Sequence, residues 1–244
     1  MLRFFRQIRQ RLITDNKFSK YLLYAVGEIL LVVIGILIAF QVDNWNEQRK
    51  IRLEGISLLE DLKSDLEFSR TELEYTINTN QQYLDGYRRI HYYLENDLAY
   101  NTELDSAFGN LDVWSIPLFS TTTYETLKTK GIDIIANDSL KQQIIEVHNF
   151  NIQSLLDDTG LWEWSFSQNT TQRIMVGNVR RSIDSDIARP NDFERLRTNE
   201  EFMNFLSILI NIREDHIDYA KMTHSAIKDL IDHIEEELQT NKLE

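Results

Sequence analysis

The sequence predicts an all-α protein with one N-terminal transmembrane helix and an elongated helical-bundle domain outside the cytoplasm. Three observations carry this fold class. Residues 21–41 form a run of about twenty mainly apolar residues, the length that a helix needs to cross a bilayer. Only 8 glycines and 2 prolines occur in 244 residues, which leaves few positions for tight turns. Apolar residues then recur at helical spacing through most of the remaining chain.

The apolar run is interpreted as a transmembrane helix over residues 20–42, so the lipid bilayer is the first expected partner. Tyr21 and Trp45 flank the run, where amphipathic rings prefer the headgroup layers. A buried core helix and a cleaved signal peptide are the alternatives. The length of the run argues against the first, and the absence of a small-x-small cleavage site after it argues against the second.

The charges beside the span predict its orientation. Six basic residues and one acidic residue precede it, whereas both signs are mixed directly after it. Because positive charge stays on the cytoplasmic side, we expect a single-pass protein of the inner membrane with its N-terminus in the cytoplasm. The predicted parts are an amphipathic cytoplasmic leader (1–19), the span (20–42) and a periplasmic helical domain (43–244) with long first and last helices.

One ionisable residue interrupts the span. Glu28 shares a helix face with Gly35 and Ala39, and Tyr24 lies one turn before it. An ionised carboxylate is costly inside a bilayer, so Glu28 is expected to be neutral, hydrogen-bonded or facing protein. We interpret these residues as a polar clasp to an identical helix or to a membrane protein partner. The alternative is a carboxylate in a proton relay or an ion path. Such a path needs several polar residues, and this helix offers only one.

The part of the chain after the span is strongly acidic. Residues 42–244 carry 20 basic and 37 acidic side chains, a net charge of −17. Nucleic acid and a flat anionic lipid surface would both repel such a domain, so nucleic acid is not an expected partner. The chain has no cysteine, which excludes disulfides, thiolate metal sites and thiol nucleophiles.

A long first helix is predicted to continue for some fifty residues beyond the span. Every seventh residue from Leu59 to Leu94 lies on one seam, which polar residues interrupt at Ser69, Thr76 and Asn80. Such a seam suits either the core face of a bundle or a homo-oligomeric coiled coil. The bundle is favoured because later segments also carry apolar faces that need burial.

Capping signals place the later helices. Thr122 with Glu125, and Thr198 with Glu201, have the spacing of capping boxes. The first is expected to open a short helix, and the second a long last helix that ends near Leu238.

Glycine and asparagine mark the boundaries between these two helices. Gly131 is expected to end the short helix as a C-cap, and the polar cluster at Asn137 to start another. Gly160 is expected to separate that helix from a helical segment with a less regular pattern. An irregular stretch with Pro117 precedes all of them.

Several strings resemble a known family. GEI at residues 27–29, IGILIA at 34–39 and NWNE at 44–47, together with residues 121–145, are similar to a family of single-span membrane proteins from Gram-negative bacteria that is known only as a domain of unknown function. The resemblance covers nearly the whole chain. It implies the single-span topology and no chemistry, and it implies that the family signature comprises Gly27, Glu28, Gly35, Asn44, Trp45 and Asn46.

No catalytic, cofactor or metal constellation is recognised in the sequence, so an enzyme is not expected. Phosphate-binding loops and nucleophile elbows are missing. The last three histidines are spaced by eight and nine residues, which does not make a chelating pair.

Aromatic residues offer the remaining candidate site. They could line a partner groove, although filling the core between long helices is the more frequent use of such residues. The candidate groove residues are Tyr83, Tyr87, Trp114, Trp162 and Trp164.

The leading hypothesis is therefore a non-catalytic, membrane-anchored scaffold that presents a helical domain to a partner. The alternative is a sensory ligand-binding module that signals through a membrane partner. A proton- or ion-conducting oligomer built around Glu28 is a third possibility. An apolar pocket enclosed by the helices would favour sensing, and exposed aromatic ridges would favour the scaffold.

Overall fold

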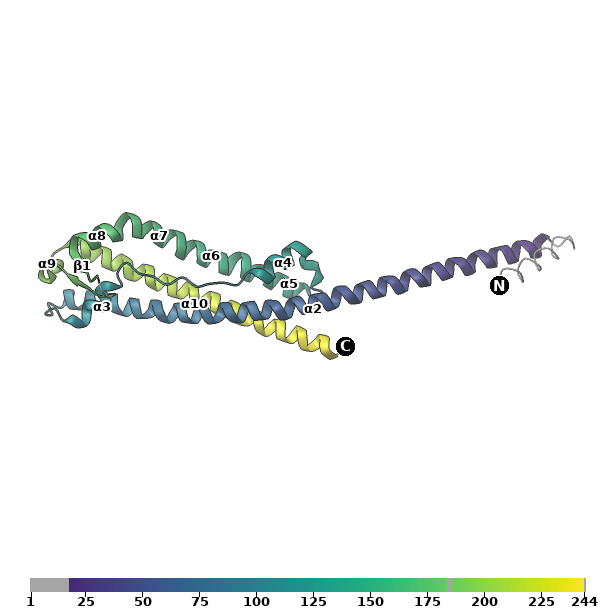
Figure 1. Ribbon diagram of the computed structural model, residues 1–244, viewed down its shortest axis with the longest axis horizontal. Helices are drawn as coiled ribbons and strands as arrows, with labels where there is room; N and C mark the ends of the chain where they lie inside the picture. The colour runs from purple at the N-terminus through teal and green to yellow at the C-terminus, as the bar shows by residue number, and fades with distance from the viewer. Residues whose placement is uncertain (1–17, 184–185, 244) are drawn as a thin grey trace. The chain divides into compact units, whose positions relative to one another are not determined.

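The protein is almost entirely helical, as the computed structural model shows for residues 18–183 and 186–243 (Figure 1). Two strands of three residues each are the sheet structure within this described part. The predicted leader, residues 1–19, lies outside the described residues apart from its last two, which belong to the first helix. The chain divides into two compact units, one up to Glu54 and one from Gly55 onward.

Helix α2 (Phe18–Glu95) is continuous over 78 residues, and its part before Gly55 makes up the described portion of the first unit. This part contains a window that is long and apolar enough to cross a membrane, and none of that window is buried inside the protein. An apolar helix surface without cover from its own chain needs lipid or another helix around it. The predicted long apolar helix near the N-terminus is confirmed.

Three long helical segments build the second unit. They are α2 from Gly55 onward, a continuous helix from residue 138 to 178, and α10 (Glu200–Leu243). Ion pairs between α2 and α10 show the direction in which each helix runs. Lys63 pairs with Glu235 at 2.8 Å and Arg88 pairs with Glu214 at 2.5 Å, so α10 runs antiparallel to α2. The unit is therefore a bundle, and the heptad seam is its core face.

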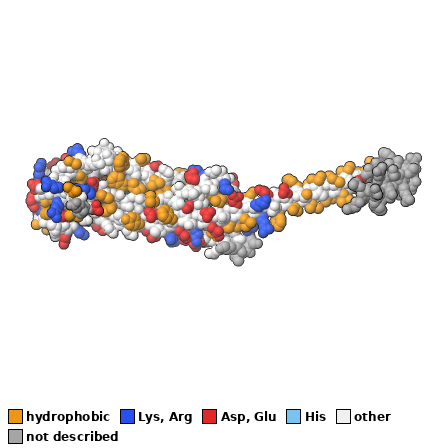
Figure 2. All heavy atoms as spheres, viewed as in Figure 1, with side chains coloured by type: hydrophobic (Ala, Val, Ile, Leu, Met, Phe, Trp, Pro, Cys, Tyr) orange, Lys and Arg blue, Asp and Glu red, His pale blue; other side chains and the backbone are white. Residues whose placement is uncertain are grey.

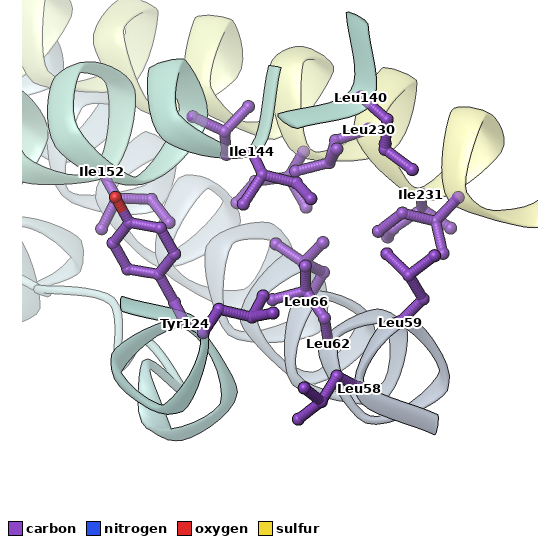
Figure 3. Close-up of a cluster of buried hydrophobic side chains, with 14 of the residues drawn as sticks. Leu58, Leu59, Leu62, Leu66, Tyr124, Leu140, Ile144, Ile152, Leu230 and Ile231 are labelled. Carbon is purple, nitrogen blue, oxygen red and sulfur yellow. The ribbon is translucent and has the colours of Figure 1, made fainter. Parts of the chain in front are cut away.

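A mainly aliphatic cluster fills one end of the bundle. Side chains of α2, α5 (Asp138–Glu146) and α10 point toward one another there, and α4 (Thr122–Lys130) adds Tyr124 (Figure 3). Leu62 and Leu66 on α2 are fully buried in this cluster. Burying a leucine side chain contributes about 1.5–3 kcal/mol, so each of these two residues stabilises the fold.

A second cluster, rich in aromatic rings, fills the other end. It combines Tyr87 of α2, Phe108 of α3 (Asp105–Gly109), Phe193 of α9 (Phe193–Arg197) and Phe202 of α10. Short elements meet at varied angles here, and rings fill the irregular gaps. Phe108 packs edge-on to Phe193 with ring centroids 6.3 Å apart.

The middle helix of the bundle alternates between α and π turns. The α segments are α5, α6 (Gln153–Leu156), α7 (Glu163–Phe166) and α8 (Gln172–Asn178). The π segments between them are η3 (Val147–Ile152), η4 (Asp157–Trp162) and η5 (Ser167–Thr171).

Gly160 lies inside η4, so the prediction that it separates two helices is wrong. A π turn is wider than an α turn, so each π segment shifts which residues face the core. This shift accounts for the irregular pattern of the sequence from residue 161 onward.

A segment without helix or strand, residues 113–121, returns along α2 and is called the strap. Asn80 holds it by two hydrogen bonds to the Ser115 backbone, of 2.9 and 3.1 Å. Ser69 Oγ accepts a bond of 3.1 Å from the Ser120 backbone N–H. Ser69 and Asn80, which interrupt the heptad seam, are therefore hydrogen-bond partners of the strap's backbone.

The two capping boxes are wrong in detail. Helix α4 begins at Thr122, but its N-cap makes no side-chain bond, and Asp65 of α2 accepts from the Thr123 N–H instead. Helix α10 begins at Glu200, where Asn199 accepts from the Phe202 N–H at 3.2 Å. The helix then continues to Leu243, beyond the predicted end.

Other predicted boundaries are confirmed. Gly131 ends α4 with a φ of 97°, and Asn137 caps α5 through the Leu140 N–H. Short helical turns, η1 (Thr102–Leu104) and η2 (Ile132–Ile134), complete the connections.

A small antiparallel hairpin joins the middle helix to α9. Strand β1 (Val179–Arg181) pairs with β2 (Ala188–Pro190). The hairpin lies directly on α3, because a Cβ at Gly109 would be only 2.0 Å from the carbonyl oxygen of Asp186. Glycine is required at this position for that approach.

Candidate functional site

A layer of buried polar side chains lies between the two hydrophobic clusters, and it is called the charged layer. Its members are Asn80 of α2, Glu163 of α7, and Arg213 and His216 of α10. All four are buried, and Arg213 is only 1% exposed. Charged side chains are rarely buried this completely, so the layer is a candidate functional site.

Arg213 is the centre of the charged layer. Its terminal nitrogens bind both carboxylate oxygens of Glu163, one of them at 3.2 Å. The same nitrogens reach Asn80 Oδ1 at 3.1 Å and the Val113 carbonyl of the strap at 3.4 Å. A two-point bond of this kind fixes the relative position of α7 and α10 and also ties in the strap.

The Glu163 carboxylate has a second partner in His216, whose Nδ1 lies 2.7 Å from Oε2. Tyr87 lies beside Arg213, with its ring centroid 6.0 Å from the guanidinium carbon. Its hydroxyl donates to the Asn110 carbonyl at 2.7 Å. Burial is the main cause that raises the pKa of Tyr87 far above its ordinary value. A neutral phenol of the second hydrophobic cluster therefore lies beside the paired cation of the charged layer.

Sequence reasoning missed Glu163, Arg213 and His216 as a site. A signal was present in the sequence of α10. Its buried positions recur at heptad spacing from Phe202 to Ala220, and Arg213 and His216 occupy two consecutive positions of this series. A charged residue on a core position of an amphipathic helix indicates a buried partner. Which partner it meets depends on the middle helix, whose π turns bring Glu163 to face it.

A second polar cluster joins α2, α4 and the middle helix, and it is called the capped carboxylate. Asp65 accepts from the Ser120 hydroxyl at 2.6 Å and from the Thr123 N–H at 3.0 Å. Partial burial raises the pKa of Asp65, but the hydrogen bonds from Ser120 and Thr123 outweigh it and lower the pKa overall.

His148 completes the second cluster. Its ring stacks on Tyr124 with centroids 4.1 Å apart, and its Nδ1 lies 2.8 Å from the Ile144 carbonyl. That carbonyl requires a proton on Nδ1, which leaves Nε2 as a buried atom without a partner in the described structure. Burial lowers the pKa of His148, against the opposing effects of the Ile144 carbonyl and Asp65.

The predicted groove aromatics do not share one surface. Tyr87 is buried in the second hydrophobic cluster, whereas Tyr83 and Trp114 are half-buried. Trp162 and Trp164 are 54% and 58% exposed on the middle helix.

An exposed apolar ridge runs along the middle helix instead. Leu161 is 70% exposed beside the two tryptophans, and Phe150 lies exposed further along the same helix. Trp162 stacks on Phe166, with ring centroids 5.9 Å apart, and is held in place by it. We call Leu161, Trp162 and Trp164 the ridge. Figure 2 shows hydrophobic side chains gathered over the part of the domain where α6 and α7 lie.

The predicted membrane clasp lies on the first unit. The unbroken backbone of α2 keeps Glu28, Gly35 and Ala39 on one helix face. A Cβ added at Gly35 would meet no atom within 4 Å. Trp45 is exposed, while the side chains of Tyr21 and Tyr24 lie outside those that the structure describes.

In the described part of the chain, no group of three or more histidine or acidic residues is arranged so that it could hold a metal ion. The four side chains of the charged layer are buried from solvent. Its bonds hold α7, α10 and the strap together.

Comparison with known proteins finds a match to a protein family. A family of unknown function, DUF6090, matches residues 28–95 of the chain. The matched region begins at Glu28 and ends with the last residue of α2, so it covers the larger part of the apolar segment and the whole heptad seam. No curated protein and no solved structure matches the chain.

Proposed function

We propose that the chain is a non-catalytic, membrane-anchored interaction protein whose helical domain presents the ridge to a protein partner. The anchor is the apolar part of α2, in the inner membrane with the N-terminus in the cytoplasm. The basic residues before the span and the acidic domain after it support this orientation. The helical domain then lies in the periplasm.

The observation that carries this proposal is the exposure of the ridge. Large apolar side chains exposed on a helix, one of them stacked on a neighbouring ring, are typical of a protein interface. Tryptophan is also the residue type most enriched among the positions that dominate binding energy. The interior of the domain is filled at the same level by Arg213 and Tyr87, which favours an external site over a ligand cavity.

A photo-crosslinking experiment tests the ridge. A benzophenone amino acid replaces Leu161 in the full-length protein in its membrane, and the matched control carries it at the exposed Gln82 of α2. We expect a discrete adduct from position 161 that is lost when Trp164→Ser is added. Equal adducts from both positions, or an adduct insensitive to Trp164→Ser, would contradict the proposal.

Self-association through the clasp is the second part of the proposal. Native mass spectrometry in mild detergent compares the wild type with Glu28→Leu and Gly35→Leu, and with Ile36→Leu as the control that keeps the helix apolar. We expect a defined oligomer that both clasp variants dissociate and the control leaves intact. A monomeric wild type would rule out the homo-oligomer, and with it the ion-conducting alternative.

A sensory module is the second candidate function. The charged layer and the π turns favour it, because buried ion pairs on a helix with irregular turns allow two alternative packings. The signal would pass along α2, which is shared by both units. A stimulus that changed hydrogen-exchange protection in α10 and α2 together would favour sensing over the scaffold.

A further inference from the structure

The start of α4 is held by contacts with two different long helices. Asp65 of α2 accepts from the Thr123 N–H at 3.0 Å. On the other side, Tyr124 stacks on His148 of the middle helix and donates to Asn149 Oδ1 at 3.0 Å. Figure 3 shows Tyr124 reaching from α4 toward the middle helix. The position of α4 therefore depends on a carboxylate on one side and on a histidine on the other.

The packing around His148 suits only the neutral imidazole. The residue is 6% exposed, and its Nδ1 lies 2.8 Å from the Ile144 carbonyl, so this nitrogen carries the proton. Its Nε2 is buried and has no partner among the described residues. In the imidazolium, Nε2 would be a second N–H donor. A buried donor without an acceptor, on a buried charge, costs free energy, so protonation disfavours this arrangement.

Two charged groups act on His148 from the elements packed against it. They are Asp65 from α2 and Glu125 from α4, and both favour the protonated ring. Glu125 is already paired with a lysine of α4, while the stacked Tyr124 is a further titratable group. Helix α10 also packs on η3, where the hydroxyl of the neutral Thr223 donates to a backbone carbonyl at 3.3 Å. Asp65 therefore both acts on His148 and holds α4 on α2.

His148 changes its charge in the mildly acidic range, whereas Asp65 does not. Burial lowers the pKa of His148 from its ordinary 6.5, so the buried ring takes up a proton less readily than a ring in water. Partial burial raises the pKa of Asp65, but the bonds from Ser120 and Thr123 lower it overall from its ordinary 3.8. A state in which His148 reaches water is therefore favoured increasingly as the pH falls below about 6.5.

We propose that His148, Tyr124 and Asp65 form a pH switch, which releases α4 from α2 and the middle helix when the ring takes up a proton from solvent. Nε2–H then obtains an acceptor in one of two ways: the ring leaves Tyr124 for water, or it draws Asp65 away from Thr123. Either movement breaks a contact that holds the start of α4.

Helix α4 is suited to leave while the long helices stay packed. Its buried apolar residues are Tyr124 and Leu127, whereas α2, α5 and α10 supply most of the first hydrophobic cluster. Gly131 ends α4 with a φ of 97°, so the chain already turns sharply there. The switch is separate from the ridge and does not depend on it. It names acid as the stimulus for the sensory alternative.

Hydrogen exchange followed by mass spectrometry tests the switch. The full-length chain in phosphatidylcholine nanodiscs is compared at about pH 7.5 and about pH 5.5, with labelling times scaled to the intrinsic pH dependence of exchange. The reported segment is residues 120–130. The reference segment is residues 200–212 of α10, which contain no histidine. His148→Phe removes the titrating group and keeps a ring, and His224→Phe makes the same change at the histidine that contacts Glu74.

In the wild type, opening of residues 120–130 should increase by up to about tenfold between the two pH values, because the exposed ring takes up its proton in this range. The reference segment should keep its protection. His148→Phe should abolish the increase, and His224→Phe should keep it. Equal loss of protection in both segments would overturn the proposal, because the whole bundle would then be opening.

A second variant covers the case in which a larger ring disturbs folding. His148→Gln does not titrate and keeps a polar group at this position, so it should also abolish the increase. Circular dichroism confirms that each variant is folded at about pH 7.5. An increase that persists in a folded variant without His148 would overturn the proposal.

Discussion

The charged layer and the capped carboxylate solve the same problem by different means. Both place a carboxylate among apolar helices. Glu163 is almost fully buried and contacts Arg213 and His216, whereas Asp65 is half-buried and accepts from a hydroxyl and a backbone N–H. The first joins helix to helix, and the second joins a helix to the start of α4.

The difference concerns what each arrangement depends on. A buried ion pair offsets its desolvation cost only while both partners are present, so the charged layer fails as a unit. A carboxylate that caps a helix uses groups which would otherwise be unsatisfied, and water can replace it in part. The charged layer specifies which residues of the long helices face each other, while the capped carboxylate stabilises locally.

The largest expected effect comes from breaking the charged layer. Glu163→Leu leaves Arg213 buried without its counter-ion and should lower the free energy of unfolding by about 3–5 kcal/mol. The double variant Glu163→Leu/Arg213→Met removes both charges and should recover most of this loss. Urea denaturation followed by circular dichroism measures both. A single variant within about 1 kcal/mol of the wild type would show that the layer is not held by this pair.

A smaller effect is expected at the capped carboxylate. Asp65→Ala removes the bonds to Ser120 and Thr123 and should cost about 1–3 kcal/mol, with faster hydrogen exchange at the Thr123 amide. Glu67→Ala is the control, because its ion pair with Lys63 is exposed and should change stability by less than about 0.5 kcal/mol. Equal effects of the two substitutions would show that the capped carboxylate stabilises the protein no more than the surface ion pair does.

The stability of the same region should depend on pH. Because burial lowers the pKa of His148 below its ordinary 6.5, the unfolded chain takes up a proton in a range where the folded protein does not. Stability is then complete above about 6.5 and falls as the pH drops toward the folded pKa, by at most about 1.4 kcal/mol per pH unit. His148→Phe keeps the stacking on Tyr124 and should flatten this slope between pH 7 and pH 5 in denaturation experiments. An unchanged slope would assign the effect to other groups.

The smallest expected effect is that of a substitution at Gly160, and Gly109 gives the contrasting case. Gly160→Ala places a Cβ in open space on the middle helix and should stabilise the domain by about 0.5–1 kcal/mol. Gly109→Ala forces its Cβ against the Asp186 carbonyl and should destabilise the hairpin end. Thermal unfolding of the two variants measures both signs. Destabilisation by Gly160→Ala would mean that the π turn needs glycine.

Local patterns in the sequence were sufficient for the helices but not for their partners. The heptad from Leu59 to Leu94 predicts a buried face on α2, and all of its members are buried. The polar interruptions at Ser69 and Asn80 could be seen, but not that the strap would bind them. A capping box is likewise a local signal, and at α4 a residue 58 positions away took its place.

The sequence by itself determined the apolar segment, the acidic charge of the domain, the long helices and the Gly131 and Asn137 boundaries. These follow from composition and from spacing along one helix, which act over a few residues. Only the tertiary structure decided that Glu163 meets Arg213, that Asp65 caps α4 and that Arg180 faces Arg189. Such contacts join residues far apart in the chain, and π turns or strand register, which depend on packing, set which side chains face each other.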